Sequence, residues 1–330
     1  MQSDAALIEQ FLAGQPRALA RAISRSEAGN GAAIVRAVYH RSGRAMTIGL
    51  TGPPGVGKST LSGALIRIAR ASGKTVGVVS VDPSSPFSHG AILGDRIRLT
   101  EHFTDSDVFI RSMASHGHLG GLAGATGDAV TLMDAFGKDV LLVETVGVGQ
   151  SEVEIAQLAD TTLVTLQPGS GDSVQLLKAG ILEVADVFVV NKADHPMARH
   201  LQREIRSMME MLDFHGWVPR LVATQANEGV GVDALWEAIL AHREYLRDSG
   251  ELEQKRRSAF MHQTRQLALG RLEDCVDAEI ARMEGPHANG EAVDPYAAAE
   301  RIMAAIAPTA HAEERRTHRT APLRATVKGL

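Results

Sequence analysis

Seven short apolar runs dominate the middle of the sequence, and each is followed by glycine, aspartate or proline and then by a segment with helical spacing. Strands that alternate with helices in this way indicate a parallel sheet with crossover helices. Several runs are apolar at consecutive positions, as expected for strands covered on both faces. We therefore predict an α/β fold with a mostly parallel central sheet flanked by helices. The predicted strands are residues 45–50, 75–81, 108–111, 140–143, 161–165, 187–190 and 220–223.

Helical patterns flank these runs on both sides. Apolar residues recur at helical spacing through the first forty or so residues, and no strand is indicated after residue 246. Residues 251–283 carry an apolar stripe at steps of three and four, and a second helix is expected to begin at Pro295 with Asp294 as its cap. The predicted parts are an N-terminal helical extension (1–43), an α/β domain (44–246) and a C-terminal helical region with its tail (247–330).

The two C-terminal helices leave two interpretations open. They can pack on their own domain, or they can form a dimerisation arm. A helix over residues 251–283, rising about 1.5 Å per residue, reaches past one domain and would leave part of its stripe in water.

The composition excludes several classes of protein. With 44% hydrophobic residues, 22% charged residues and a formal net charge of -5, the chain is not a polycation, and a nucleic-acid partner is disfavoured. Its one cysteine, Cys275, cannot form an internal disulfide and is expected to be a small buried residue on a helix. No apolar run approaches the twenty or so residues that span a bilayer. We expect a cytoplasmic protein with no membrane partner.

A phosphate-binding loop follows the first predicted strand. Its glycines allow backbone N–H groups to turn toward an anion, and the next helix adds favourable partial charge at its N-terminus. Lys58 is expected to reach the outer phosphates and the Ser59 hydroxyl to contact Mg²⁺. The full G-x-x-x-x-G-K-[ST] pattern is present as Gly52-Pro53-Pro54-Gly55-Val56-Gly57-Lys58-Ser59-Thr60.

A second motif favours GTP over ATP. Asn191-Lys192-Ala193-Asp194 follows a predicted strand, where open α/β sheets bind ligands. The Asp194 carboxylate can accept both the ring N–H and the amino group of guanine, a donor pair that adenine lacks. Thr224-Gln225-Ala226-Asn227 is placed to close over the base, although it departs from the usual Ser-Ala-Lys.

Three acidic residues are candidates for the Mg²⁺ and γ-phosphate region. Glu144 and Gly147 occupy the place of an Asp-x-x-Gly motif, with glutamate in place of aspartate. Asp82 is at the end of the strand that directly follows the phosphate-loop helix. A strand at this place, rather than a long loop, implies a parallel neighbour of the phosphate-loop strand. Asp95 lies in a loop-like stretch that could close over Mg²⁺. Val148 stands where many GTPases have a water-orienting glutamine, so intrinsic hydrolysis should be slow, unless Gln150 substitutes.

These motifs closely resemble the MeaB/ArgK family, the methylmalonyl-CoA mutase-associated GTPases of the SIMIBI class of P-loop proteins. The resemblance covers nearly the whole chain and rests on residues 81–86, 144–152 and 191–194. It implies a homodimeric GTPase that binds the adenosylcobalamin-dependent mutase, gates loading of the cobalamin cofactor and protects the mutase from inactivation. It also implies that Lys58, Asp82, Asp95, Glu144 and a mobile segment over 167–178 serve hydrolysis, Mg²⁺ and signalling to the partner.

Three other functions stay open. A metal-insertion GTPase would usually carry a Cys-x-Cys-Cys motif or a histidine tract, whereas this chain has one cysteine and the short pair His116 and His118. A kinase of a transport system should show a base for an acceptor hydroxyl, and no such residue is evident. A non-catalytic nucleotide-gated scaffold would release no phosphate.

Overall fold

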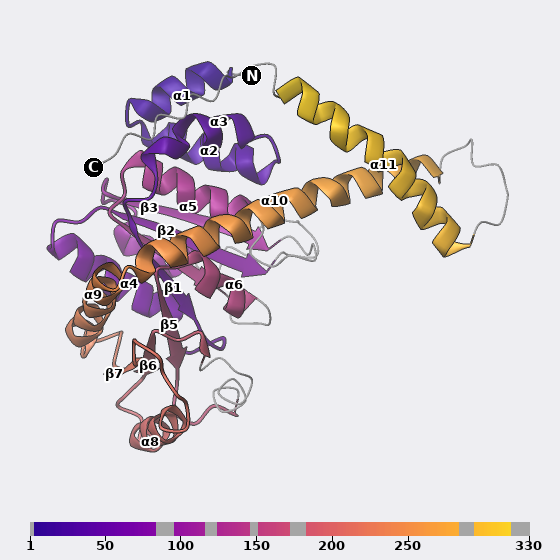
Figure 1. Cartoon of the computed structure of the whole chain (residues 1–330). Coiled ribbons are helices and arrows are strands. Elements are labelled where there is room, and N and C mark those ends of the chain that lie inside the picture. The colour runs from indigo at the N-terminus through magenta and orange to yellow at the C-terminus, as the bar shows by residue number, and fades with distance from the viewer. Residues whose placement is uncertain are drawn as a thin grey trace. The chain divides into compact units, whose positions relative to one another are not determined.

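The central element is a seven-stranded parallel sheet in the order β3-β2-β4-β1-β5-β6-β7 (Figure 1). The computed structural model describes residues 3–83, 96–115, 124–145, 151–171, 183–283 and 294–317. Each of the seven predicted strands is present, so the α/β prediction is confirmed. The strands are β1 Met46–Thr51, β2 Val76–Pro83, β3 Val108–Ser115, β4 Val140–Thr145, β5 Thr161–Leu166, β6 Val187–Asn191 and β7 Arg220–Thr224.

Helices cover both faces of the sheet, because neighbouring residues of the buried strands point to opposite sides. Leu142 of β4 packs in the core below α4 and α9, whereas Leu141 and Val143 pack toward α5 and α6. The helical extension α1 to α3 lies against α5 (Figure 1). The helices of the sheet region are α4 Lys58–Ala71, α5 Gly124–Phe136, α6 Ser151–Leu158, α8 Ala198–Met209 and α9 Val232–Asp248, after α1 Asp4–Leu12, α2 Pro16–Glu27 and α3 Ala32–Val38.

The strand order corrects one expectation. β2 is parallel to β1 but is not its neighbour, because β4 lies between them. This order pairs Leu50 of β1 with Glu144 of β4 and brings the glutamate next to the phosphate-loop strand. Strands β2, β3 and β4 then lie on one side of β1, and β5, β6 and β7 lie on the other. Such a switch point is where open α/β sheets bind ligands, at the carboxyl ends of the strands.

The C-terminal helices are α10 Glu251–Met283 and α11 Pro295–Thr317, both beginning where the sequence predicts. The Asp294 carboxylate accepts the backbone N–H groups of Tyr296 at 3.0 Å and Ala297 at 3.1 Å, as an N-cap does. By contact density the chain divides into two compact units, 1–263 and 264–330, so α10 begins in the first unit. Within the described residues, no helix is long and apolar enough to cross a bilayer.

Cys275 does not fit its prediction. The side chain is exposed, and along the whole of α10 no residue is buried. The helical spacing of the apolar stripe was read correctly, but spacing does not tell whether anything covers the stripe.

Ionisable residues join α10 to the amino edge of the sheet, and we call this group the amino-edge cluster: Asp160, Asp186, His242, Lys255 and Arg256. The Arg256 guanidinium donates to both carboxylate oxygens of Asp160 at 3.0 and 3.1 Å, and also to the carbonyl of Ala45 at 2.8 Å. Lys255 Nζ lies 3.0 Å from an Asp186 carboxylate oxygen. The first turns of α10 are therefore bound to the segments that precede β1, β5 and β6.

His242 is the most deeply buried member of this cluster, with 1% of its surface exposed. Its Nδ1 lies 2.9 Å from Thr161 Oγ1, and its Nε2 lies 3.3 Å from Asp186 Oδ1. Burial lowers the pKa of His242 to about 4, with Lys255 adding to the effect, although the carboxylates of Asp186, Glu251 and Asp160 oppose it. The imidazole is therefore neutral in the folded protein at neutral pH.

The low pKa of His242 predicts acid-sensitive stability. An unfolded histidine titrates near 6.5, so between about pH 6.5 and pH 4 the unfolded chain binds more protons than the folded chain. The free energy of unfolding should fall by about 2 kcal/mol more between pH 7 and pH 5 in the natural protein than in His242→Gln. Urea unfolding followed by tryptophan fluorescence measures this difference, since the Trp217 ring lies 4.8 Å from the His242 ring. Parallel pH profiles for the two proteins would contradict it.

Candidate functional site

The phosphate loop joins β1 to α4 at the switch point of the sheet. Gly52, Gly55 and Gly57 have φ angles of 138°, 80° and 95°, which side-chain-bearing residues rarely adopt. A Cβ atom at Gly52 would lie 2.0 Å from the carbonyl oxygen of Thr165, and one at Gly57 would lie 2.5 Å from the Asn191 amide nitrogen. The glycines thus permit a tight turn and close contact with the ends of β5 and β6. Pro53 and Val56 are buried, whereas Pro54 and Thr60 are exposed.

Lys58 begins α4 and is buried. Its ammonium group donates to the carbonyl oxygens of Gly52 at 2.7 Å and Pro53 at 3.0 Å, so the side chain lies over the loop that precedes it. A buried ammonium favours a nearby anion, and this one is next to the positive end of the α4 dipole. The arrangement is suited to binding phosphate groups.

Glu144 lies at the end of β4 and meets the first turns of α4. Its Oε1 accepts a hydrogen bond from Ser59 Oγ at 2.7 Å, and its Oε2 accepts one from Ser62 Oγ at 3.0 Å. All three side chains are buried. Ser59 and Glu144 together present hard oxygen donors of the kind that Mg²⁺ prefers.

Asn191 connects three segments at the carboxyl edge of the sheet. Its Nδ2 donates to the carbonyl of Val56 in the phosphate loop at 2.8 Å. Its Oδ1 accepts from Thr224 Oγ1 at 3.0 Å and from the backbone N–H of Ala226 at 3.2 Å. Asn191 therefore fixes the geometry of the phosphate loop relative to the predicted base-binding loops.

Lys192 and Asp194 occupy the turn after β6. Lys192 has a positive φ of 57°, and its ammonium donates to the carbonyl of Gly55 at 2.9 Å and to Gln167 Oε1 at 2.5 Å. The Ala193 backbone N–H donates to the Thr224 carbonyl at 3.0 Å, and Asp194 is exposed. The backbone is held on both sides of Asp194, while its carboxylate is accessible to a ligand.

The turn after β7 supplies the second predicted base-binding segment. Gln225 donates its backbone N–H to the Val230 carbonyl at 2.9 Å, which closes the turn. Ala226 is buried beside Asn191, whereas Asn227 is exposed. The structure thus brings residues 52–60, 144, 191–194 and 225–227 to one edge of the sheet.

The other predicted site residues are less fully placed. Asp82 lies in the last residues of β2, paired with Ala114 of β3. Asp95, Gly147, Val148 and Gln150 lie outside the described residues, as do His116 and His118. Among the residues that are described, no group of three or more His, Cys, Asp or Glu side chains could hold a metal on its own. A Mg²⁺ ion at Ser59 and Glu144 would complete its coordination with phosphate oxygens and water, as is usual for this ion.

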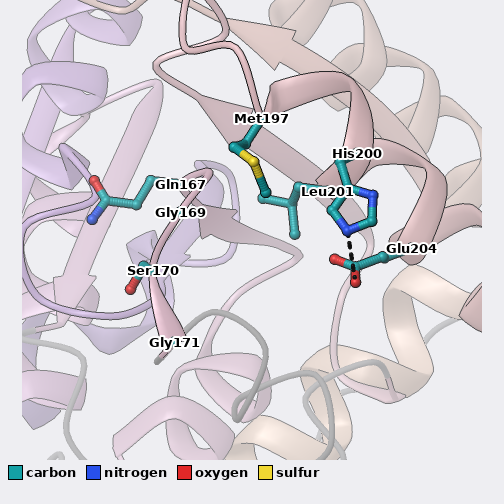
Figure 2. Close-up of a pocket in the computed structure, with 8 residues that line it drawn as sticks. All are labelled: Gln167, Gly169, Ser170, Gly171, Met197, His200, Leu201 and Glu204. Atoms are coloured by element: carbon teal, nitrogen blue, oxygen red, sulfur yellow. Dashed lines mark ion pairs between the residues drawn. The ribbon is translucent and has the colours of Figure 1, made fainter.

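A cavity of about 230 Å³ adjoins the base-binding side (Figure 2). It lies between the loop that follows β5 and the start of α8, with Met197 and Leu201 as its apolar lining. His200 Nε2 and Glu204 Oε1 lie 3.4 Å apart there. Gln167, the bond partner of Lys192, lies on the opposite side.

Two residues of this region were not predicted from sequence as site residues in their own right. Ser62 follows Ser59 by three positions, so helical spacing could have placed both on one side of α4. Gln167 was predicted only as the start of a mobile segment. Its bond to Lys192 has no signal in the sequence, because 25 positions separate the two residues.

Comparisons with known proteins identify the family of this chain. The family model described as methylmalonyl-CoA mutase-associated GTPase MeaB matches residues 17–281. A Pyrococcus abyssi protein named as a GTPase is 45% identical over 310 residues, which cover 91% of this chain and 96% of that protein. The GTPase ArgK of Escherichia coli is 38% identical over 229 residues, which cover 68% of this chain and 69% of ArgK.

A solved structure shares the fold over most of the chain. The crystal structure described as LAO/AO transport system kinase has a TM-score of 0.67 and 25% sequence identity, and the match covers 92% of this chain and 97% of that one. The predicted resemblance is thus confirmed by sequence and by fold. With its phosphate loop and guanine motif at one edge of the sheet, the chain belongs to the MeaB family of methylmalonyl-CoA mutase-associated GTPases and is itself a GTPase.

Proposed function

We propose that this GTPase hydrolyses GTP with Mg²⁺ and acts as a chaperone of an adenosylcobalamin-dependent methylmalonyl-CoA mutase. In this role it gates loading of the cobalamin cofactor and protects the mutase from inactivation. The observation that carries the nucleotide-binding part of the proposal is the Asn191 side chain, which joins the phosphate loop to both predicted base-binding turns. The family description supplies the mutase.

The residues at the edge of the sheet have distinct roles in the proposed hydrolysis. Backbone N–H groups of the phosphate loop and the Lys58 ammonium bind the β- and γ-phosphates and stabilise the charge that develops on them. Ser59 and Glu144 would hold Mg²⁺, which neutralises charge between the two phosphates. Asp82 and Asp95 are proposed to complete that region, and Gly147 to sense the γ-phosphate. Asp194 selects guanine.

The link from nucleotide to partner is proposed to run through Gln167. The Lys192 ammonium bonds both to the phosphate loop at Gly55 and to Gln167, which begins the segment implied to signal to the mutase. A change at the nucleotide that moves Lys192 would therefore alter the start of that segment. This route is short, since it needs only the side chains of Lys192 and Gln167.

We also propose that the protein is a homodimer built through its C-terminal helices. No residue of α10 is buried, and Leu269, Leu272 and Ile280 each expose 40% of their surface or more. A repeated apolar stripe of this kind is typical of a protein interface.

Mutase is expected to accelerate GTP hydrolysis. Val148 stands in the place of a water-orienting glutamine, so the isolated protein should turn over slowly, and a partner that orders the surrounding loops should lower the barrier. We expect at least about a tenfold faster single-turnover rate with mutase, or about 1.4 kcal/mol off the barrier. The proposed homodimer is tested separately, because sedimentation of the chain alone should then give two chains per particle.

Calorimetric titrations of mutase in the GTP-analogue and GDP states complete the test. If mutase binds the GTP-analogue and GDP states with different affinities, then mutase must change the GTPase's relative affinity for the two nucleotides by the same factor. Equal rates and equal affinities would leave a GTPase without this partner. Transfer of the γ-phosphate to another molecule, in place of its release, would favour a kinase, as the structural relative is described.

A further inference from the structure

Glu144 is held by two serines, and only one of them belongs to the phosphate-loop motif. Ser59 Oγ donates to Oε1 at 2.7 Å, and Ser62 Oγ donates to Oε2 at 3.0 Å. The exposed fractions of Ser59, Ser62 and Glu144 are 3%, 0% and 5%, so neither bond competes with bulk water. Both oxygens of the carboxylate are thus anchored to the same helix.

The two serines cannot have the same role. A hydroxyl has one proton and two acceptor positions, so Ser59 can donate to Glu144 and still ligate a cation through its oxygen. Ser62 lies about one helical turn further along α4 and is fully buried. A polar group at that depth costs free energy unless it is hydrogen-bonded, and its bond is to Glu144.

The length of the Glu144 side chain explains why a second anchor is useful. Aspartate is usual at this position, and glutamate has one more rotatable bond to fix before its carboxylate faces the ligand. A hydrogen bond to the second oxygen restricts that extra freedom in the absence of nucleotide. Ser62 thereby compensates for the departure from aspartate.

We propose that Ser62 is a positioning residue, which orients the Glu144 carboxylate so that Oε1 and Ser59 Oγ are presented together to the Mg²⁺ of the bound nucleotide. This proposal rests on the Mg²⁺-dependent GTPase function above. It assigns Ser62 no contact with the nucleotide or with the metal.

The test measures the affinity for a fluorescent GDP analogue in Mg²⁺ and in EDTA. The dissociation constant in EDTA divided by that in Mg²⁺ measures how much the metal strengthens nucleotide binding. The constant in EDTA alone shows whether the phosphate loop is intact. We expect Ser62→Ala to lower this ratio roughly tenfold, because a lost hydrogen bond to a charged group weakens the positioning of that group. Ser62→Thr, which keeps the hydroxyl, should recover most of the ratio. Ser72→Ala, at the exposed end of the same helix, is the matched control.

A double-mutant cycle separates positioning from simple destabilisation. Glu144→Gln should also lower the ratio, and adding Ser62→Ala to it should lower the ratio little further, because the serine acts only through the carboxylate. Additive losses would overturn the proposal, as would a Ser62→Ala ratio equal to that of the natural protein. If the natural protein itself showed no Mg²⁺ dependence, the proposed metal requirement would fail together with this inference.

Discussion

Lys58→Ala is expected to lower GTP hydrolysis by a factor on the order of 100 to 1000 while leaving the fold intact. Removing one preorganised group that stabilises transition-state charge typically costs this much. The ammonium already lies over the phosphate loop through bonds to Gly52 and Pro53, so little reorganisation is needed when phosphate arrives. The variant loses two hydrogen bonds to loop carbonyls, and Lys58 is not among the residues of the described apolar core clusters. Thermal unfolding should therefore change little.

Single-turnover phosphate release measures the effect of Lys58→Ala. Lys74→Ala is the control, because Lys74 is an exposed lysine just beyond the other end of α4. Turnover above one tenth of the natural rate would mean that another group stabilises the transferred phosphate.

Asp194→Asn should change base selectivity, lowering the preference for guanine over xanthine by at least about a hundredfold. Xanthine carries a carbonyl where guanine carries an amino group, and the asparagine amide can donate where the carboxylate only accepts. The backbone beside Asp194 is fixed by the bond from Ala193 to Thr224, so the substituted side chain should occupy the same place.

Competition between GDP and xanthosine diphosphate measures this change directly. Asp213→Asn is a matched control, since the Asp213 side chain is 88% exposed and lies outside the site. An unchanged preference for guanine in Asp194→Asn would remove Asp194 from the base site.

The sequence predicted the elements of the fold better than their arrangement. Apolar runs, glycines and the Asp294 cap are local signals, and each of the seven strands and both C-terminal helices was found from them. The position of β4 between β1 and β2 was missed, because the side-by-side order of parallel strands depends on packing across the whole sheet. The exposure of Cys275 was missed for a related reason, since burial depends on what covers a helix.

The candidate site divides in the same way. Phosphate-loop and guanine motifs are short and contiguous, so their residues could be named in advance. The bond between Ser62 and Glu144 spans 82 positions, and the bonds from Arg256 to Asp160 span 96. Contacts of that kind arise only after the chain has folded, and a single sequence carries no pattern that reveals them.

During synthesis on the ribosome, the sheet emerges before the residues that secure its amino edge. The Ala45 carbonyl accepts a hydrogen bond from Arg256, which lies 211 positions later in the chain. The same guanidinium donates to Asp160, which precedes it by 96 positions. At about 5 to 20 residues per second, the interval after Asp160 lasts on the order of 5 to 20 seconds. Until then, the Asp160 and Asp186 carboxylates lie at the amino edge of a nascent parallel sheet without Arg256 and Lys255, their partners in the folded protein.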